Sequence, residues 1–401
     1  KYVIFTLIIF ILLVTTFTYF STLKQNNIYK EESIKPTKIT KGISMNLEQT
    51  AGAGDYKTVT QSGWPTDGYQ LNTELSRCEN GSTLSWDDTK KVVIVSGNLS
   101  DKCYVYFDKV FTLASYVISQ YTGTQGENGI YYHNSSLSNG AGDNSYRYAG
   151  ANPNNYVCFG TSESSCQTDN LYRIIGVIDG KVKLIKYDYA NSNLLGTDGN
   201  YADTKTPNAS YYKGNLKSID TYYWYYSTKG GGVIWSTSLL NTIHLNTNFI
   251  NNIDKTWINK IATTTWKVEK SENVYTAKII ASVAYKNDYG QTEYNAKIGL
   301  IYISEYGFAA DPSAWTSYLS NYNELAIKST NWMYMGFSEW TISPSAEFSN
   351  NVFTIGEYGS VSYDYDVFDT SYYATRPTFF LNSSVTYVSG TETQSDPIII
   401  N

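Results

Sequence analysis

Charged side chains are scarce in this chain, and histidine is almost absent. Asp, Glu, Lys and Arg together make up 16% of the 401 residues, and only two histidines occur. The formal net charge of −6 provides no basic field that would attract nucleic acid or anionic lipid. We therefore expect no nucleic-acid partner, and chemistry that needs an imidazole has only His133 and His244 available.

The short motifs that accompany common catalytic sites are also missing. No G-x-S-x-G is present, and the glycines of AGAGDYKT at 51–58 lack the spacing of a phosphate-binding loop. His244 lies in TSLLNTIHL, whose pattern indicates a packed helix, and His133 lies in the polar stretch IYYHNSSL, where we expect local hydrogen bonds. No motif singles out a carboxylate pair among the 36 Asp and Glu residues. We predict a protein that is not an enzyme and has no cofactor.

One long apolar run stands at the N-terminal end. Residues 2–20, YVIFTLIIFILLVTTFTYF, contain no charge, glycine or proline. At about 1.5 Å per residue this run matches a hydrocarbon layer of roughly 30 Å, and no A-x-A-like cleavage site follows it. We predict an uncleaved transmembrane signal anchor at 1–20, followed by a flexible linker over the polar residues 21–50.

All cysteines lie downstream of the apolar run. Their even count of four beyond an export signal indicates disulfide bonds and an oxidising compartment. Metal binding would instead favour C-x-x-C spacing with nearby histidine, which is absent. We predict the sequence-nearest pairs, Cys78 with Cys103 and Cys158 with Cys166.

The remaining sequence indicates two β-rich domains. Short alternating runs between Gly, Asp and Asn turns predict a small β-sandwich at 51–110, and FTLASYVISQY followed by TGTQGENG predicts a helix and connector at 111–145. In residues 146–401, Asp179-Gly180 indicates a β-hairpin within LYRIIGVIDGKVKLIKYD.

Helices and further strands are expected after this hairpin. TSLLNTIHL and NFINNIDKTWINKIA predict two helices that cover one face of a sheet, and a short helix is expected at 312–320. Strands are expected in AKIGLIYISEYGFA, EWTISPS, NVFTIGEYGSVSYDY and RPTFFL. The predicted fold class is therefore α+β.

Several stretches resemble a family of uncharacterised surface proteins of gut Firmicutes and related Bacilli. The resemblance lies in SYRYAGANPNNYVCFG, NLYRIIGVIDGKVKLIK, YNAKIGLIYISEYGFA, EWTISPS, YATRPTFFLNSSVTYVSG and SGTETQSDPIII, and it spans most of residues 130–401. It implies a cell-surface location, and an N-terminal β-domain, here expected to be Ig-like, with its Cys78–Cys103 pair recurs in such proteins.

That family in turn resembles the C-type-lectin-like fold of formylglycine-generating enzymes. Glu339-Trp340-Thr341 and Arg376-Pro377 occupy places comparable to two strands of that fold. Those enzymes use cysteines in the C-terminal part of the fold, but this chain has none after Cys166. We therefore expect Glu339, Trp340 and Arg376 to be structural, with Glu339 as one possible partner of the Arg376 guanidinium.

Two segments could bind a ligand. The run Tyr222 to Tyr226 offers Tyr223, Trp224, Tyr225 and Tyr226 as a stacking platform for sugars, although strand alternation would place about half of such a run in a core. Asp364, Asp366 and Asp369 in DYDVFD could supply oxygen ligands to calcium. Three acids in a turn are also typical of a solvated loop, and the glycine and glutamate of an EF-hand are missing.

These features together predict a single-pass protein of the cell membrane with an extracellular C-terminal ectodomain. The favoured function is adhesin-like, non-catalytic binding of a host or bacterial glycan or surface protein. The alternative is a structural subunit of a surface appendage or envelope assembly, and a secreted hydrolase is third.

Overall fold

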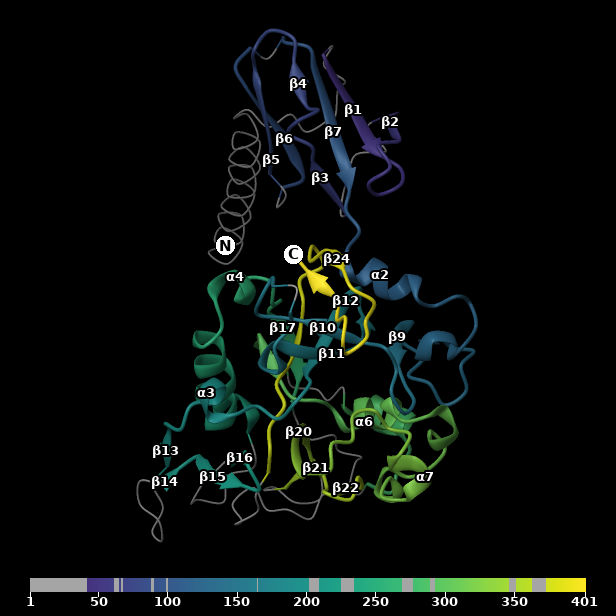
Figure 1. The fold of residues 1–401 in the computed structure, drawn as a ribbon, viewed down its shortest axis with the longest axis vertical. Coiled ribbons are helices and arrows are strands. Elements are labelled where there is room, and N and C mark those ends of the chain that lie inside the picture. Colours follow the sequence, from purple (N-terminus) through teal and green to yellow (C-terminus); the bar gives the residue numbers. More distant parts are fainter. Residues whose placement is uncertain are drawn as a thin grey trace, which may run out of the picture. The chain divides into compact units, whose positions relative to one another are not determined.

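The computed structural model describes residues 42–60, 65, 68–87, 90–98, 100–163, 165–201, 209–224, 234–268, 277–288, 293–345, 351–362 and 373–401. The fold is mixed α+β with several sheets, and the chain divides into two compact units between Phe111 and Thr112 (Figure 1). The predicted anchor at 1–20 lies outside the described residues. Among those that are described, no helix is both long and apolar enough to cross a bilayer.

The described residues of the smaller unit form seven short strands. They are β1 (Ile43–Glu48), β2 (Tyr56–Val59), β3 (Tyr69–Leu71), β4 (Arg77–Cys78), β5 (Thr83–Asp87), β6 (Val92–Ser96) and β7 (Cys103–Lys109). Five of them form a sheet in the order β2-β1-β7-β3, in which β4 also pairs with β7, and β5 and β6 form a separate hairpin. The strand β1 falls inside the predicted linker, and its parallel pairing with β7 makes it an inner strand of the sheet.

Apolar side chains from both sheets of the smaller unit share one core. Met45 and Leu47 of β1 and Phe107 of β7 lie in the same buried cluster as Val93 and Val95 of β6. Alternate residues of each strand point to this core because side chains in a strand change faces with a period of two. The core therefore lies between two facing sheets, as the alternating sequence pattern predicts.

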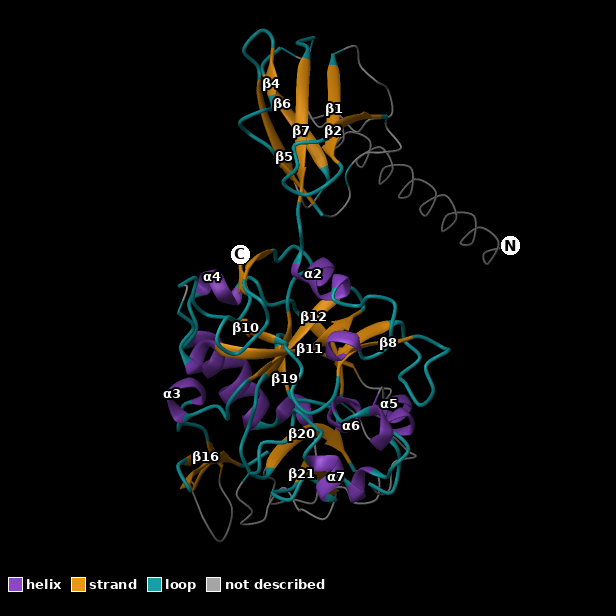
Figure 2. Ribbon diagram, turned by 45° about the vertical axis from the view of Figure 1, so that its right-hand side comes forward, coloured by secondary structure: helices purple, strands orange, loops and turns teal. Residues whose placement is uncertain are grey.

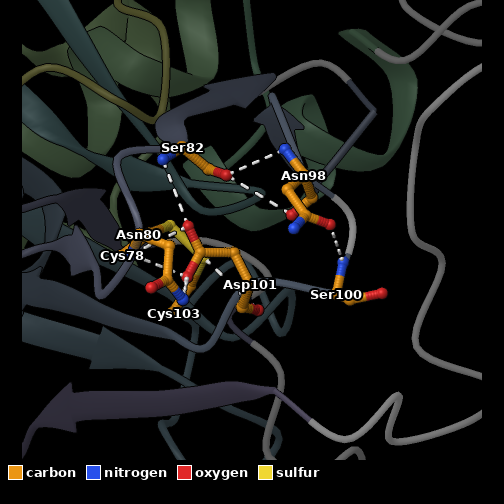
Figure 3. Close-up of a disulfide and its surroundings, with 7 residues drawn as sticks. All are labelled: Cys78, Asn80, Ser82, Asn98, Ser100, Asp101 and Cys103. Carbon is orange, nitrogen blue, oxygen red and sulfur yellow. Dashed lines mark hydrogen bonds between the residues drawn. A yellow bond between two sulfur atoms is a disulfide. The ribbon is translucent and has the colours of Figure 1, made fainter.

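The predicted disulfide between Cys78 and Cys103 is present in this unit. The two residues stand opposite each other on β4 and β7. Beside the bond, the carboxylate of Asp101 accepts hydrogen bonds from the backbone N–H of Asn80 at 2.9 Å and of Ser82 at 3.2 Å (Figure 3). These bonds fix the loop that leads into β5 against the loop that precedes β7.

A seven-stranded antiparallel sheet forms the centre of the larger unit (Figure 2). Its strands are β8 (Ile130–His133), β9 (Ser145–Tyr148), β10 (Tyr156–Cys158), β11 (Leu171–Ile178), β12 (Lys181–Lys186), β19 (Ile298–Gly299) and β23 (Thr378–Phe380). The order is β19-β23-β12-β11-β9-β8, and β10 also pairs with β11. The segment 111–145, expected as a helix and connector, contains the helix Leu113–Ser119 and also contributes the edge strand β8.

The two central strands are joined by the predicted turn. Asp179 and Gly180 both have positive φ, 49° and 71°, as a two-residue type I′ hairpin requires. Residue 176 must be glycine for a different reason, because a Cβ there would lie 2.1 Å from the carbonyl oxygen of Tyr146 on the neighbouring strand.

Both faces of this sheet are covered. Ile174 and Leu184 belong to one buried cluster, while their sequence neighbours Ile175 and Ile185 belong to another. The helical elements are α2 (Leu113–Ser119), η2 (Glu127–Gly129), η3 (Thr168–Asn170), α3 (Ser192–Leu195), η4 (Trp235–Thr237), η5 (Leu240–Phe249), α4 (Lys255–Ile258), α5 (Ala281–Asp288), α6 (Ile303–Ala309), η6 (Pro312–Ala314), η7 (Leu319–Asn321) and α7 (Leu325–Lys328). α2, η5 and α4 contribute to the first cluster, and α5 and α6 contribute to the second.

The helix predicted in TSLLNTIHL is present, and two other predictions need correction. The segment η5 is a ten-residue π-helix, in which Asn246 donates to the side-chain oxygen of Asn241, five residues earlier, at 2.8 Å. The expected helix at 312–320 consists of two separate 3₁₀ turns. The C-terminal part of the strand expected in AKIGLIYISEYGFA is instead the fully buried helix α6, at whose start the backbone N–H of Tyr302 donates to the side chain of Glu305.

Small accessory sheets surround the central one. Their strands are β13 (Asn200–Tyr201), β14 (Ala209–Ser210), β15 (Tyr212–Leu216), β16 (Ile219–Tyr222), β17 (Thr264–Lys267), β18 (Glu293–Ala296), β20 (Glu339–Pro344), β21 (Val352–Ile355), β22 (Val361–Ser362), β24 (Tyr387–Ser389) and β25 (Ile399–Ile400). The second predicted disulfide, between Cys158 and Cys166, links β10 to the loop before β11. Each disulfide therefore lies within one unit.

Candidate functional site

Arg376 and Glu339 form a buried ion pair. The Nε of Arg376 donates to Oε2 of Glu339 at 2.6 Å, and its Nη2 donates to Oε1 at 2.5 Å. The same Nη2 donates to the carbonyl oxygen of Met333 at 2.7 Å, and both charged side chains are 2% exposed. The predicted partnership with Glu339 is confirmed, and the geometry leaves neither group facing solvent.

The indole of Trp340, the residue after Glu339 in β20, is also buried in the core. Its Nε1 donates to the carbonyl oxygen of Tyr222 at 2.6 Å, and its ring contacts that of Tyr373. Trp224 makes a reciprocal bond, in which Nε1 donates to the carbonyl oxygen of Thr341 at 2.9 Å. These two bonds join β20 to the end of β16.

Two of the four residues predicted to form a stacking platform are buried in the core. Trp224 is fully buried against Trp235, and Tyr223 is 6% exposed beside Tyr211. A ring enclosed on both faces cannot stack on a sugar, so these two residues serve the core. Tyr225 and Tyr226 lie outside the described residues.

Neither histidine faces solvent. The backbone N–H of Ala141 donates to Nδ1 of His133 at 3.0 Å, and burial together with the nearby Arg147 lowers the pKa of His133 to about 3. The expected local hydrogen bond is present, but the residue is enclosed rather than part of a polar surface loop. His244 bonds the carbonyl oxygen of Leu195 through Nδ1 at 2.6 Å, and burial lowers its pKa.

The expected calcium ligands cannot be placed. Asp364, Asp366 and Asp369 fall in 363–372, outside the described residues. Within the ranges that are described, no group of three or more His, Cys, Asp and Glu side chains is arranged to hold a metal ion.

A surface pocket of about 470 Å³ lies beside α4 in the larger unit. This volume is within the range of roughly 300–1,000 Å³ that is typical of small-ligand sites. Polar groups predominate among its lining residues, which are Lys255, Thr256, Asn259, Lys260, Asn382, Ser384, Val385 and Asn401.

Hydrogen bonds hold the two walls of this pocket together. Asp254 caps α4 by accepting from the backbone N–H of Thr256 at 2.8 Å. From the segment after β23, Asn382 donates its backbone N–H to the carbonyl oxygen of Lys260 at 2.8 Å and its Nδ2 to that of Asn259 at 2.7 Å. Val385 is a buried apolar residue of the pocket lining.

The charged side chains that line the pocket are both lysines. Lys255 and Lys260 supply ammonium groups, and none of the eight lining residues has a carboxylate side chain. The Nζ of Lys260 also lies 5.5 Å from the ring centre of Trp257, whose face partly orients it. The remaining amide and hydroxyl groups both donate and accept hydrogen bonds. The pocket is therefore suited to a hydroxyl-rich ligand that carries an acidic group.

Sequence reasoning missed this pocket because its walls are more than 120 residues apart in the chain. Both segments were recognised for other reasons, DKTWINK as part of a helix and FLNSSV as part of a family resemblance. The bridge between Ile261 and Leu381 brings them together, and no local pattern signals such a pairing.

Comparison of the chain with models of protein families, with curated proteins and with solved structures gave no match.

Proposed function

We propose that this chain is a membrane-anchored protein of the cell surface whose larger unit binds an acidic glycan, without catalysis, in the pocket beside α4. The observation that carries the proposal is the combination of about 470 Å³ of open volume with two lysines, three asparagines and two hydroxyl side chains. Sugars are bound through such neutral hydrogen-bonding groups, and an acidic substituent would pair with the ammonium groups.

The extracellular location is supported by cysteine chemistry. All four cysteines of the chain are joined in two disulfides, which persist in oxidising compartments and are rare in the cytosol. The apolar run at 2–20 supports a membrane anchor. The resemblance to surface proteins of gut Firmicutes agrees with both.

Within this proposal the smaller unit is an Ig-like β-sandwich, and the larger unit has a C-type-lectin-like fold. Two sheets around one core support the first assignment. For the second, Glu339-Trp340-Thr341 lies on the fully buried strand β20, and the Arg376 segment leads directly into β23. In the sequence, the residues that line the pocket precede β20 and follow β23.

A binding experiment tests the pocket. A soluble protein of residues 42–401, which retains the inner strand β1, is probed on an array of neutral and acidic glycans. We expect binding to acidic glycans, and we expect the double substitution Lys255→Ala and Lys260→Ala to weaken it by at least about tenfold, or about 1.4 kcal/mol. Binding should also weaken between 0.1 M and 1 M salt, because the screening length falls from about 10 Å to about 3 Å.

The matched control is Lys286→Ala, which removes an exposed lysine from α5, an element that does not line the pocket. This variant should bind like the unmodified protein. Equal binding by the double variant would exclude the pocket as the site. If no glycan bound the unmodified protein, the surface-assembly alternative would become the better explanation.

A further inference from the structure

Lys183 and Glu305 form a buried ion pair inside the larger unit. The Nζ of Lys183 on β12 lies 2.6 Å from Oε1 and 2.8 Å from Oε2 of Glu305 on α6, and the two side chains are 1% and 4% exposed. The carboxyl carbon between these oxygens is therefore close to the amine as well. The rings of Trp266, Tyr302 and Phe380 surround the nitrogen, with centres 4.9–5.2 Å away.

A second buried carboxyl group belongs to the same cluster. Asp288, at the end of α5, accepts hydrogen bonds from the backbone N–H of Ser304 at 3.0 Å and from the hydroxyl of Ser343 at 2.6 Å. Its charge interacts with both Lys183 and Glu305. Burial raises the pKa of Asp288 to about 6, against the opposing effect of the two serine hydrogen bonds. Asp288 can therefore carry a proton close to neutral pH.

The surroundings of Lys183 disfavour its charged form. Burial lowers the pKa of Lys183, although the neighbouring Glu305 opposes this shift. A buried ion pair loses the hydration of both ions, and its mutual attraction frequently fails to offset this loss. An amide has no net charge and would remove the desolvation cost of both groups at once.

We propose that Lys183 and Glu305 are joined in the mature protein by an isopeptide bond between Nζ and Cδ. This modification is independent of the proposed function and needs no cofactor. It would covalently link β12 to α6 through two residues that are 122 positions apart in the chain.

The reaction is a condensation in which atoms and charges balance. The ammonium of Lys183 gives up a proton, and the carboxylate of Glu305 takes one. The neutral amine then attacks Cδ, the N–C bond forms, and the C–Oε1 bond breaks as this oxygen leaves with two protons as water. Both protons that leave come originally from the ammonium group, so no oxidant or further reactant is required. Asp288 is the neighbouring acid that can hold a proton during the transfer.

The other carboxyl oxygen is held where negative charge would develop. The backbone N–H of Tyr302 donates to Oε2 of Glu305 at 3.0 Å, in the capping box of α6. When the amine attacks, charge accumulates on the oxygen that remains bound, and a fixed donor stabilises it. The same contacts that fix the side chain of Glu305 would therefore also assist the step.

Peptide mapping of the full-length protein, extracted from membranes and reduced, tests the proposal. Trypsin cuts after Lys and Arg, so an isopeptide bond blocks cleavage at Lys183. We expect one branched peptide in which 182–186 is joined to 298–328, with the summed mass of the two less one water. Recovery of all the protein as separate 182–183, 184–186 and 298–328 peptides would overturn the proposal.

Two lysine variants separate the bond from general effects of substitution on β12. Lys183→Arg keeps a positive charge but should abolish the branched peptide, whereas Lys186→Arg on the same strand should retain it. Recovery of 298–328 in a branched peptide with any other lysine in Lys183→Arg would show that Lys183 is not the residue linked in the unmodified protein.

Variants of the two carboxyl groups test the chemistry. Glu305→Gln should form the same amide with loss of ammonia, so its branched peptide should have the same mass as that of the unmodified protein. Asp288→Asn keeps a hydrogen-bond acceptor but cannot carry the proton, and we expect bond formation to slow by about 100-fold. An unchanged rate of isopeptide-bond formation in Asp288→Asn would show that Asp288 does not take part in the proton transfer. The presence of the bond itself is tested separately by the peptide masses.

Discussion

Substitution of Arg376 by alanine is expected to lower the free energy of unfolding of the larger unit by about 3–5 kcal/mol. The guanidinium is enclosed with Glu339, and its removal leaves a carboxylate buried without its counter-charge and the carbonyl oxygen of Met333 without a donor. Urea unfolding, followed by tryptophan fluorescence, measures the change, because Trp340 lies next to Glu339 in the same strand.

An exposed ion pair provides the matched control for this substitution. Lys217 and Glu357 are 3.9 Å apart, and their side chains are 70% and 43% exposed. Lys217→Ala should change the free energy of unfolding by no more than about 0.5 kcal/mol. A loss below about 1 kcal/mol for Arg376→Ala would contradict the structural role assigned to its ion pair.

Acidification is expected to destabilise the larger unit through His133. Burial and Arg147 lower the pKa of His133 to about 3 in the folded protein, whereas the unfolded chain has the usual value near 6.5. The unfolded state therefore binds more protons below pH 6.5, so stability is fully present above that pH and is lost as the pH falls toward 3. Between pH 7.5 and 4.5 the contribution of His133 amounts to about 3 kcal/mol.

The variant His133→Asn isolates this contribution. Its side-chain oxygen can accept the hydrogen bond of the Ala141 N–H but does not titrate. Denaturation at constant salt should show that the stability advantage of the unmodified protein over this variant shrinks by about 3 kcal/mol from pH 7.5 to 4.5. A difference that stays constant with pH would mean that His133 has an ordinary pKa in the folded protein.

The buried carboxyl group of Glu392 affects the pH dependence of stability in the opposite direction to His133. Burial raises the pKa of Glu392 to about 7, although the hydroxyl of Tyr148 donates to its carboxylate at 2.7 Å. The folded state thus binds the extra proton, and this contribution is lost as the pH rises from about 4.5 to 7. The pH dependence of Glu392 therefore opposes that of His133.

Local sequence patterns determined much of the architecture. Alternating runs indicated several strands of both units, Asp179-Gly180 identified the central hairpin, and the nearest cysteines formed the disulfides. These features depend on neighbours in the chain, because strand alternation, turn geometry and short loop closure are local properties. Glu339 was also one of the partners expected for Arg376, because Arg376 stands just before the alternating run TFFL of a core strand.

The tertiary structure alone decided how distant segments were used. It enclosed Trp224 in the core, converted the buried segment after β19 into α6, and placed β1 inside a sheet where the polar composition around it had indicated a linker. It also joined Asn382 to the end of α4 and Lys183 to Glu305. Composition and periodicity record which residues avoid water, but they do not record which buried surfaces meet. Contacts between residues over 100 positions apart depend on packing of the whole chain, and both the pocket and the proposed cross-link consist of such contacts.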